Sequence, residues 1–170
     1  MKKATQVIGA VLLCAMVFAP IAFAADTGDR VGYINLTRIM KETKAGQEAS
    51  KQLTAADKAK AEILKPLAES VVRLKKEAED TKSPLEARKK AADEYVQVKK
   101  DYDRSLQDAR DELKTKEQAL AAEVYKQADV VVKAVAQKRN YSIVLTNPQV
   151  MGYLDTRVEI TDEVITEMNK

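Results

Sequence analysis

A helix start signal lies in the middle of a segment that already has the composition of a helix. In the stretch DTKSPLEARKK, Ser83 suits the N-cap, Pro84 suits the first helical position, and Glu86 completes a capping box. From about residue 38 to residue 139, nearly every residue is Ala, Lys, Glu, Gln, Asp, Leu or Val. One helix over this range would be about 150 Å long and would have this start signal and its proline in its interior. The signal therefore predicts a turn near residues 80–84 that joins two antiparallel helices.

Apolar residues recur at helical spacing on both sides of this turn, which supports a hairpin. Each stripe is too narrow to stabilise an isolated helix, but two stripes laid antiparallel cover one another. Lys60 occupies one position where the first stripe should be apolar. The first stripe contains Ala49, Leu53, Ala56, Ile63, Leu67, Val71, Leu74 and Ala78. The second contains Tyr95, Tyr102, Leu106, Ala109, Leu113, Leu120, Val124, Ala128, Val131 and Val135.

Pro66 lies in the middle of the outgoing limb. Because proline lacks a backbone N–H and clashes with the preceding turn, it should kink this helix near Lys65 or break it into two shorter helices. One interpretation is a tolerated bend. The other is a hinge that lets the distal part of the arm swing.

Short strand candidates flank the helical segment. They are VGYINL at 31–36, YSIVLT at 141–146 and a further stretch at 152–158, with a turn at Asn147-Pro148. Thr161 is predicted to cap a final short helix, with Ile160 and Ile165 forming a hydrophobic staple. The candidate strand residues are Val31, Tyr33, Ile34, Ile143, Val144, Leu145, Tyr153 and Leu154.

These elements predict an α+β fold that is mainly α-helical. The hairpin at 38–139 is the arm, and its reversal brings the segments 25–37 and 140–170 together as a small β body. Three short strands make a marginal sheet with exposed edges, and a hairpin adds little core to support them. Oligomerisation, in which several chains pool their strands, is the expected remedy, and the residues themselves leave the number of copies open.

The first 24 residues are typical of a secretory signal peptide. Lys2 and Lys3 precede an apolar run from Val7 to Phe18, and Ala22-Phe23-Ala24 fits a cleavage site. A retained membrane anchor is the alternative, but the run is short for a span of about 20 residues. We therefore expect cleavage after about Ala24, which would lower the formal net charge of +3 by two.

The composition argues against an enzyme. The chain has no histidine, and its one cysteine, Cys14, lies in the predicted signal peptide. There is no glycine-rich phosphate loop, and the acidic pairs Asp93-Glu94 and Asp111-Glu112 lie in highly charged helix. We expect no catalytic residue, no cofactor and no metal. Nucleic-acid binding would need a basic excess that the mature chain lacks.

The chain resembles the Skp/OmpH family of periplasmic chaperones over all of its mature part. The resemblance rests on the signal peptide, on VGYINLTRIMKET, on the long charged hairpin, and most specifically on YSIVLTNPQVMGYLDTRVEITDEVITEMNK. It implies a homotrimer shaped like a jellyfish, with a small β-barrel body and three helical arms around a central cavity. It also implies an ATP-independent holdase of the periplasm that keeps unfolded outer-membrane β-barrel proteins soluble in transit to the outer membrane.

Basic residues cluster around the predicted tip and are candidates for contact with acidic clients or with anionic lipid, including lipopolysaccharide. The alternative is an ordinary solvated helix face with i,i+4 ion pairs. The mature chain is nearly neutral, whereas the best-known family members have strongly basic arms. The cluster consists of Arg73, Lys75, Lys76, Lys82, Arg88, Lys89 and Lys90.

A structural or tethering coiled-coil protein of the cell envelope is the alternative function. It would share the signal peptide, the arms and the oligomeric body, but it would not bind unfolded chains. Suppression of client aggregation distinguishes the two.

Overall fold

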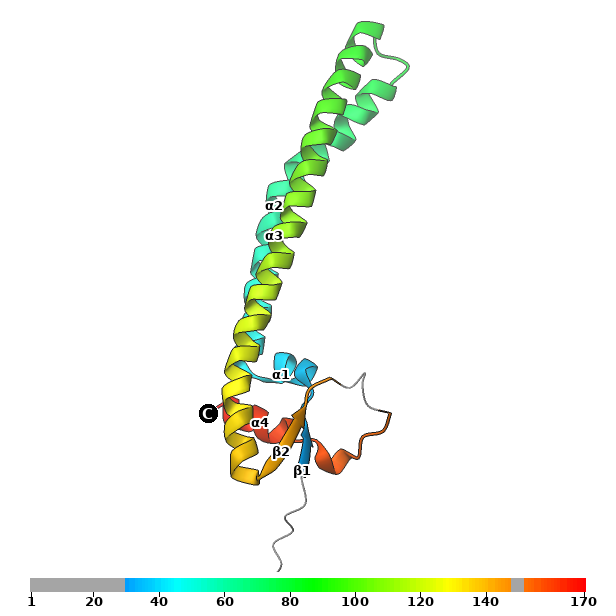
Figure 1. Cartoon of the computed structure of the whole chain (residues 1–170). Coiled ribbons are helices and arrows are strands. Elements are labelled where there is room, and N and C mark those ends of the chain that lie inside the picture. The colour runs from blue at the N-terminus through cyan, green and yellow to red at the C-terminus, as the bar shows by residue number, and fades with distance from the viewer. Residues whose placement is uncertain (1–29, 148–151) are drawn as a thin grey trace, which may run out of the picture.

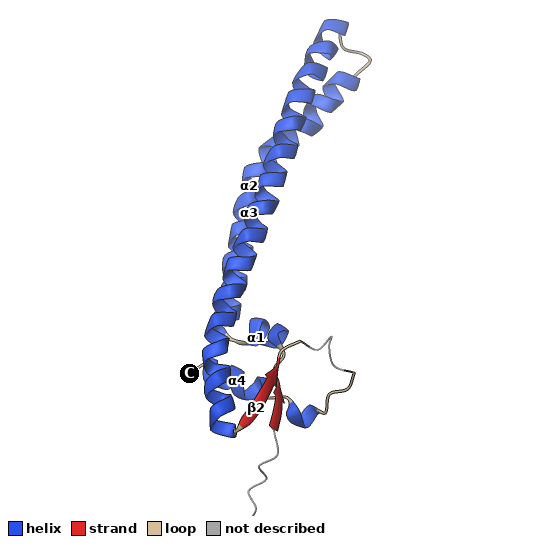
Figure 2. Cartoon of the chain, in the orientation of Figure 1, coloured by secondary structure: helices blue, strands red, loops and turns tan. Residues whose placement is uncertain are grey.

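The computed structural model describes residues 30–147 and 152–170, so the predicted signal peptide lies outside the described residues. The chain forms a long helical hairpin that rises from a small body of strands and short helices (Figures 1 and 2). The elements in chain order are β1 (Arg30–Tyr33), α1 (Leu36–Glu42), α2 (Lys44–Glu79), α3 (Leu85–Arg139), β2 (Tyr141–Leu145), the 3-10 helix η2 (Thr156–Val158) and α4 (Thr161–Met168).

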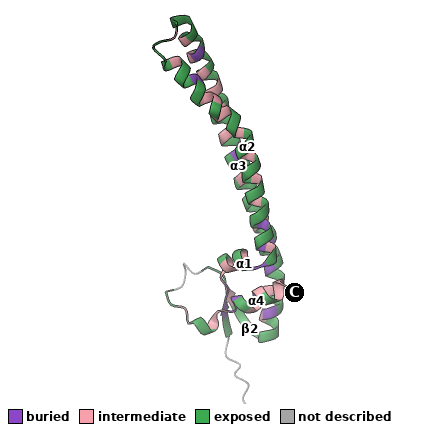
Figure 3. Cartoon of the chain, turned by 180° about the vertical axis from the view of Figure 1, so that it is seen from behind, coloured by how far each residue is buried: buried purple, intermediate pink, exposed green. Residues whose placement is uncertain are grey.

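The hairpin consists of α2, with 36 residues, and α3, with 55 residues. Figure 3 shows that most of its surface is exposed and that buried positions recur along the contact between the helices. Every residue of the predicted stripe in α3 is buried or half-buried. In α2 the stripe departs from the prediction at one place, because Ile63 is largely exposed and Leu64 is half-buried instead. A narrow seam rich in alanine therefore holds the two limbs together.

The tip turn is organised by Asp80 rather than by the predicted capping box. The Asp80 carboxylate accepts hydrogen bonds from the Lys82 N–H and the Ser83 hydroxyl, both at 3.0 Å. The Ser83 side chain is thus used within the turn, and Pro84 becomes the N-cap of α3 without a side-chain cap. The predicted box is wrong because a local Asp side-chain turn competes successfully for the same serine.

The predicted break of the outgoing helix at Pro66 is wrong. Helix α2 continues through Pro66 from Lys44 to Glu79, and the half-buried residues Leu64 and Leu67 lie in the seam on either side of the proline. Packing of this seam against α3 offsets the hydrogen bond that proline cannot donate.

The actual break lies at Thr43, which separates α1 from α2 and has extended backbone angles. Its hydroxyl donates to the Ile39 carbonyl at 2.7 Å and accepts from the Gly46 N–H at 3.0 Å. Thr43 thus ends one helix and caps the next, and we call the joint from Glu42 to Gly46 the elbow.

Strands β1 and β2 pair in parallel, and the whole arm forms the crossover between them. Val31, Gly32 and Tyr33 lie opposite Ile143, Val144 and Leu145, respectively. The predicted strand at 31–36 ends earlier, at Tyr33. Asn35 caps α1 by accepting hydrogen bonds from the N–H groups of Thr37 and Arg38. Ile34 is buried just beyond β1, and its N–H still donates to the Leu145 carbonyl.

The predicted strand at 152–158 is also wrong for its described residues. Tyr153 is 84% exposed and Leu154 is half-buried, and neither is in a strand. The Asp155 carboxylate accepts the Arg157 N–H at 2.9 Å, which favours the tight turn of η2 over extended backbone. One isolated bridge, between Tyr33 and Glu159, replaces the expected strand pairing beside β1.

Thr161 is not the N-cap that the sequence predicts for the last helix. Ile160 holds that position, without a side-chain cap, and the Thr161 hydroxyl accepts the Asn35 N–H at 2.9 Å. The threonine therefore connects α4 to the start of α1, which is a tertiary contact that local sequence patterns do not reveal.

The core of the body includes the root of the arm. Buried residues of α3 pack with those of α1, α4 and the strand ends, and the cluster extends to Ala49 in α2. Its buried members are Ile34, Ile39, Ala49, Val124, Ala128, Val135, Ile160 and Val164. Arm and body therefore share one hydrophobic core.

Candidate functional site

The described residues contain no group of three or more His, Cys, Asp or Glu side chains placed to hold a metal ion. None of the helices within 30–147 and 152–170 is long and apolar enough to cross a membrane. Exposed large hydrophobic side chains occur on the distal arm and on the small sheet, and these are the two candidate surfaces.

The hairpin brings all predicted basic residues of the tip to one end of the arm (Figure 1). Several are engaged locally: Arg73 pairs with Glu77 at 3.2 Å, and Lys89 pairs with Glu86 at 3.6 Å. Arg88 is half-buried, and its Nε donates to the Ala78 carbonyl at 3.3 Å, so this arginine fastens the two helices below the turn.

The remaining basic residues of the tip differ in their pairing. Lys90 approaches Glu94 at 3.9 Å. Lys75, Lys76 and Lys82 are exposed and form no salt bridge with any residue that the structure describes. These three lysines are the charges at the tip most available to an acidic partner.

The distal arm also carries an apolar component that was absent from the sequence-based site. Val72, Leu85 and Val96 are 69%, 60% and 60% exposed, respectively. We call these three residues the tip aliphatic set. Val72 and Val96 each directly follow a residue of the seam, and Leu85 is the first residue of α3. A solvated helix normally has polar side chains at such exposed positions.

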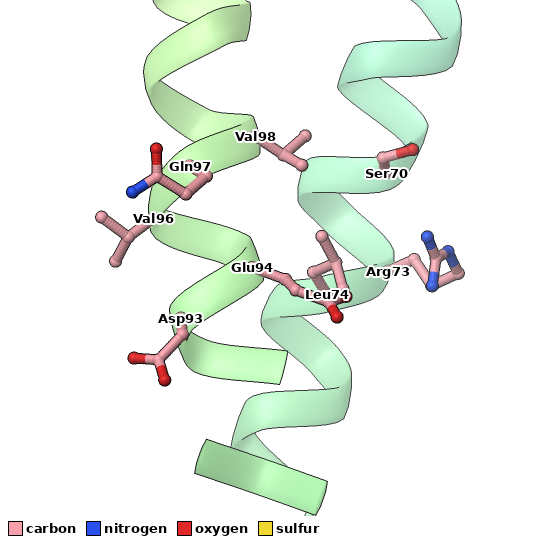
Figure 4. Close-up of a pocket in the computed structure, with 8 residues that line it drawn as sticks. All are labelled: Ser70, Arg73, Leu74, Asp93, Glu94, Val96, Gln97 and Val98. Carbon is pink, nitrogen blue, oxygen red and sulfur yellow. The ribbon is translucent and has the colours of Figure 1, made fainter. Parts of the chain in front are cut away.

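Open grooves lie beside this set. Figure 4 shows one of them, in which Leu74, Glu94 and Val98 lie between the two helices while Val96 points away from α2. A second groove follows α2 toward the turn and is lined by Val71, Val72, Lys75, Lys76, Glu77, Glu79 and Asp80. The distal arm therefore presents aliphatic groups and both signs of charge on a shallow surface and lacks the enclosed shape typical of a small-molecule site.

The sheet provides the second surface. Val31 and Ile143 lie opposite each other in the parallel register and are 38% and 52% exposed. Strand β2 has β1 on one side and no described strand on the other. Exposed aliphatic pairs and strand edges are the features through which sheets associate.

Together the described elements define a class of mainly helical proteins in which a long hairpin arm projects from a small α/β body. The model of the OmpH-like outer membrane protein family matches residues 30–168. The chain belongs to this family, and the resemblance found in its sequence is confirmed.

A solved structure has the same fold. It is the crystal structure of a protein from Caulobacter crescentus CB15 assigned as an OmpH-like outer membrane chaperone. The two chains superimpose with a TM-score of 0.66 over 83% of this chain and 84% of that chain, and they are 17% identical. At this identity the likeness concerns the fold. The comparison with curated protein sequences found no match.

Proposed function

We propose that this protein is an ATP-independent holdase chaperone of the periplasm that binds unfolded outer-membrane β-barrel proteins and keeps them soluble. Membership of the OmpH-like family supports a chaperone role. The observation that carries the proposal is the tip aliphatic set, because three large aliphatic side chains stay exposed on an arm whose own seam does not need them. Under this proposal residues 1–24 direct export and are removed after about Ala24.

The proposed assembly is a homotrimer whose strands form a shared β-barrel body. The exposed pair of Val31 and Ile143 and the outer edge of β2 support association through the sheet. In such an assembly three arms, each formed by residues 38–139, would surround a cavity in which the client is held.

Client binding is proposed to rest on many weak contacts spread over the arms. Avidity from several arms replaces a specific fit, which suits a chaperone that binds many sequences. Lys75, Lys76 and Lys82 would attract acidic segments of the client, and anionic lipid or lipopolysaccharide is a second candidate for the same charges. Bending at Pro66 would adapt the arms to clients of different size.

Dilution of a urea-unfolded outer-membrane barrel protein into buffer tests this function. The mature protein, residues 25–170, should suppress turbidity at about one oligomer per client, and the suppression should weaken with added salt if the lysines contribute. A tethering protein of the envelope would leave the turbidity unchanged. A single-chain mass in light scattering would contradict the shared body without excluding client binding.

A further inference from the structure

The last residues of the chain reach back to the elbow between α1 and α2. The Lys44 N–H, which is the first backbone donor of α2, donates to the Asn169 side-chain carbonyl at 2.7 Å. The Asn169 side-chain amide donates to the Glu42 carbonyl at 3.3 Å. The Lys44 ammonium group donates to the Asn169 backbone carbonyl at 2.5 Å. One side chain, 125 residues from Lys44 along the sequence, thus holds both sides of the joint.

The elbow itself leaves little room for rearrangement. Thr43 is fully buried, and its hydroxyl both donates to the Ile39 carbonyl and accepts from the Gly46 N–H. A Cβ atom added at Gly46 would lie 2.1 Å from the Met40 carbonyl oxygen, so only glycine allows this approach of α2 to α1. The elbow is therefore closely packed, and Asn169 contacts it at one defined position.

The opposite end of α4 is fastened to the opposite end of α1. Thr161 accepts the Asn35 N–H, and Arg38 pairs with Glu159 at 3.1 Å and with Asp162 at 2.5 Å. Helix α4 and the residue after it thus contact both ends of α1, and Asn169 makes the contact at the end of α1 that leads into the arm.

Helix α4 also packs against the root of α3. Val164 is fully buried in the shared core, and Glu163 pairs with Arg139 at 3.1 Å. The hairpin is therefore joined to the body through both limbs: α3 by direct packing, and α2 through Ala49 in the shared core, the elbow and Asn169. Without the contacts of Asn169, α2 would be held at its start by the elbow and Ala49 alone, which leaves the hairpin more freedom to rock about its root.

We propose that Asn169 is a positioning residue that latches the elbow and thereby fixes the direction in which the arm leaves the body. If the protein acts as a chaperone, the latch sets how widely the arms open around a client. The inference itself concerns the geometry of a single chain and stands apart from client binding.

The test measures the distance from body to tip in single molecules. Dye pairs are attached at cysteines replacing Thr81 in the tip turn and Thr146 after β2, both exposed, in a chain that lacks residues 1–24 and therefore Cys14. Labelled chains are mixed with excess unlabelled chains, so that each assembly carries one pair. Asn169→Ala removes the side-chain contacts to Lys44 and Glu42, and we expect a distance distribution about twice as wide as that of the parent.

Two further variants separate the latch from a general loss of structure. Asn169→Asp keeps the acceptor for the Lys44 N–H and should restore a large part of the narrow distribution. Lys170→Ala removes the ion pair with Glu167 at 2.6 Å in the same turn and should behave like the parent. An Asn169→Ala protein with parental helix content and an equally narrow distribution would overturn the proposal.

Amide hydrogen exchange gives a second, independent measurement. In the parent protein the Lys44 amide should be protected, and in Asn169→Ala it should exchange about fivefold faster or more, as expected for loss of one hydrogen bond. A Lys44 amide that exchanges in the parent at the rate of an unstructured peptide would also overturn the latch, even if Asn169→Ala failed to fold. Neither readout involves a client, so failure of the latch and failure of the holdase function are distinguishable.

Discussion

Lys60 of α2 forms an ion pair with Glu112 of α3 at a position where the seam of the arm is otherwise mainly apolar. The Lys60 side chain is 30% exposed, whereas that of Glu112 is 63% exposed. Both members of the pair line an open cavity, together with Ile63, Leu64, Ser105, Asp108 and Ala109. A charged pair at a seam position fixes the register of two helices at some cost in stability.

Replacing Lys60 with leucine should therefore stabilise the arm. A partly exposed ion pair contributes little, whereas additional apolar burial against Leu64 and Ala109 should raise the free energy of unfolding by about 1 kcal/mol. Urea denaturation followed by circular dichroism measures the change. Glu112→Gln, which removes the pair but fills no cavity, is the control and should be close to neutral. A Lys60→Leu protein less stable than the parent would show that the pair matters more than packing here.

Replacing Pro66 with alanine should also stabilise α2. The helix already continues through this residue, so alanine restores one backbone hydrogen bond without changing the path of the chain. A gain of about 1–3 kcal/mol in the free energy of unfolding is expected. If Pro66 is a hinge, the distance distribution between labels on the tip and the arm root should also become narrower. No gain in stability would mean that the helix is already adapted to proline.

Replacing Ile143 with lysine should dissociate the assembly if the chains join through their sheets. The side chain is half exposed beside Val31, so the single chain should tolerate the charge, while a second sheet packed against it should not. Light scattering should give a lower mass than for the parent. Thr146→Lys, at an exposed position just after β2, is the matched control. An unchanged mass for Ile143→Lys would place the interface elsewhere.

The tip turn should weaken in acid. The hydrogen bonds from the Lys82 N–H and the Ser83 hydroxyl hold the pKa of Asp80 below its usual value of 3.8. Because the folded pKa is lowered, this stabilisation is fully present above pH 3.8 and is lost as the pH falls through the folded pKa. An NMR titration of the Asp80 carboxyl measures the shift, and Ser83→Ala should move the pKa back toward 3.8. An Asp80 that titrates above 3.8 would contradict the turn geometry.

Replacing the tip aliphatic set with serine should weaken the holdase activity without unfolding the arm. Val72, Leu85 and Val96 are mostly exposed, so the triple variant should keep its helix content and lose less than about 1 kcal/mol of stability. More protein should be needed to suppress aggregation of the same client. Val130→Ser, which changes an equally exposed residue at the arm root, is the control. Equal losses in both variants would assign client binding to the whole arm.

The helical hairpin was predictable because its signals are local and repeated. The apolar stripe of α3 needs only the spacing of residues along one helix. The turn near Asp80 was predicted from the helix start signal at Ser83 and Pro84, and the turn is present although the capping box does not form. Ile63 was assigned to the seam in error because Ile63 and Leu64 are adjacent and both are apolar, so spacing alone does not decide which of them faces α3.

The errors concern residues whose side chains bind distant or competing partners. Ser83 has the pattern of an N-cap but is held by Asp80. Thr161 has the same pattern but accepts the Asn35 N–H. The break at Thr43 was missed because Lys41, Glu42, Lys44 and Ala45 are good helix formers and Gly46 was not recognised as a signal, while the joint depends on burial and on the contact with Asn169. The prediction for the tip of the arm named only basic residues. The exposed aliphatic residues Val72, Leu85 and Val96 were therefore missed.

The parallel pairing of β1 with β2 determines the order in which the molecule takes shape. As the chain emerges from a ribosome or an export channel, Val31 appears first, and Ile143, its opposite residue, follows only after the entire arm. Both limbs of the hairpin have emerged before β2, whereas the sheet has to wait for this C-terminal strand. Assembly of the body is therefore the last event, and a chain truncated before β2 would have the distal hairpin but would lack the core that the arm root shares with α4.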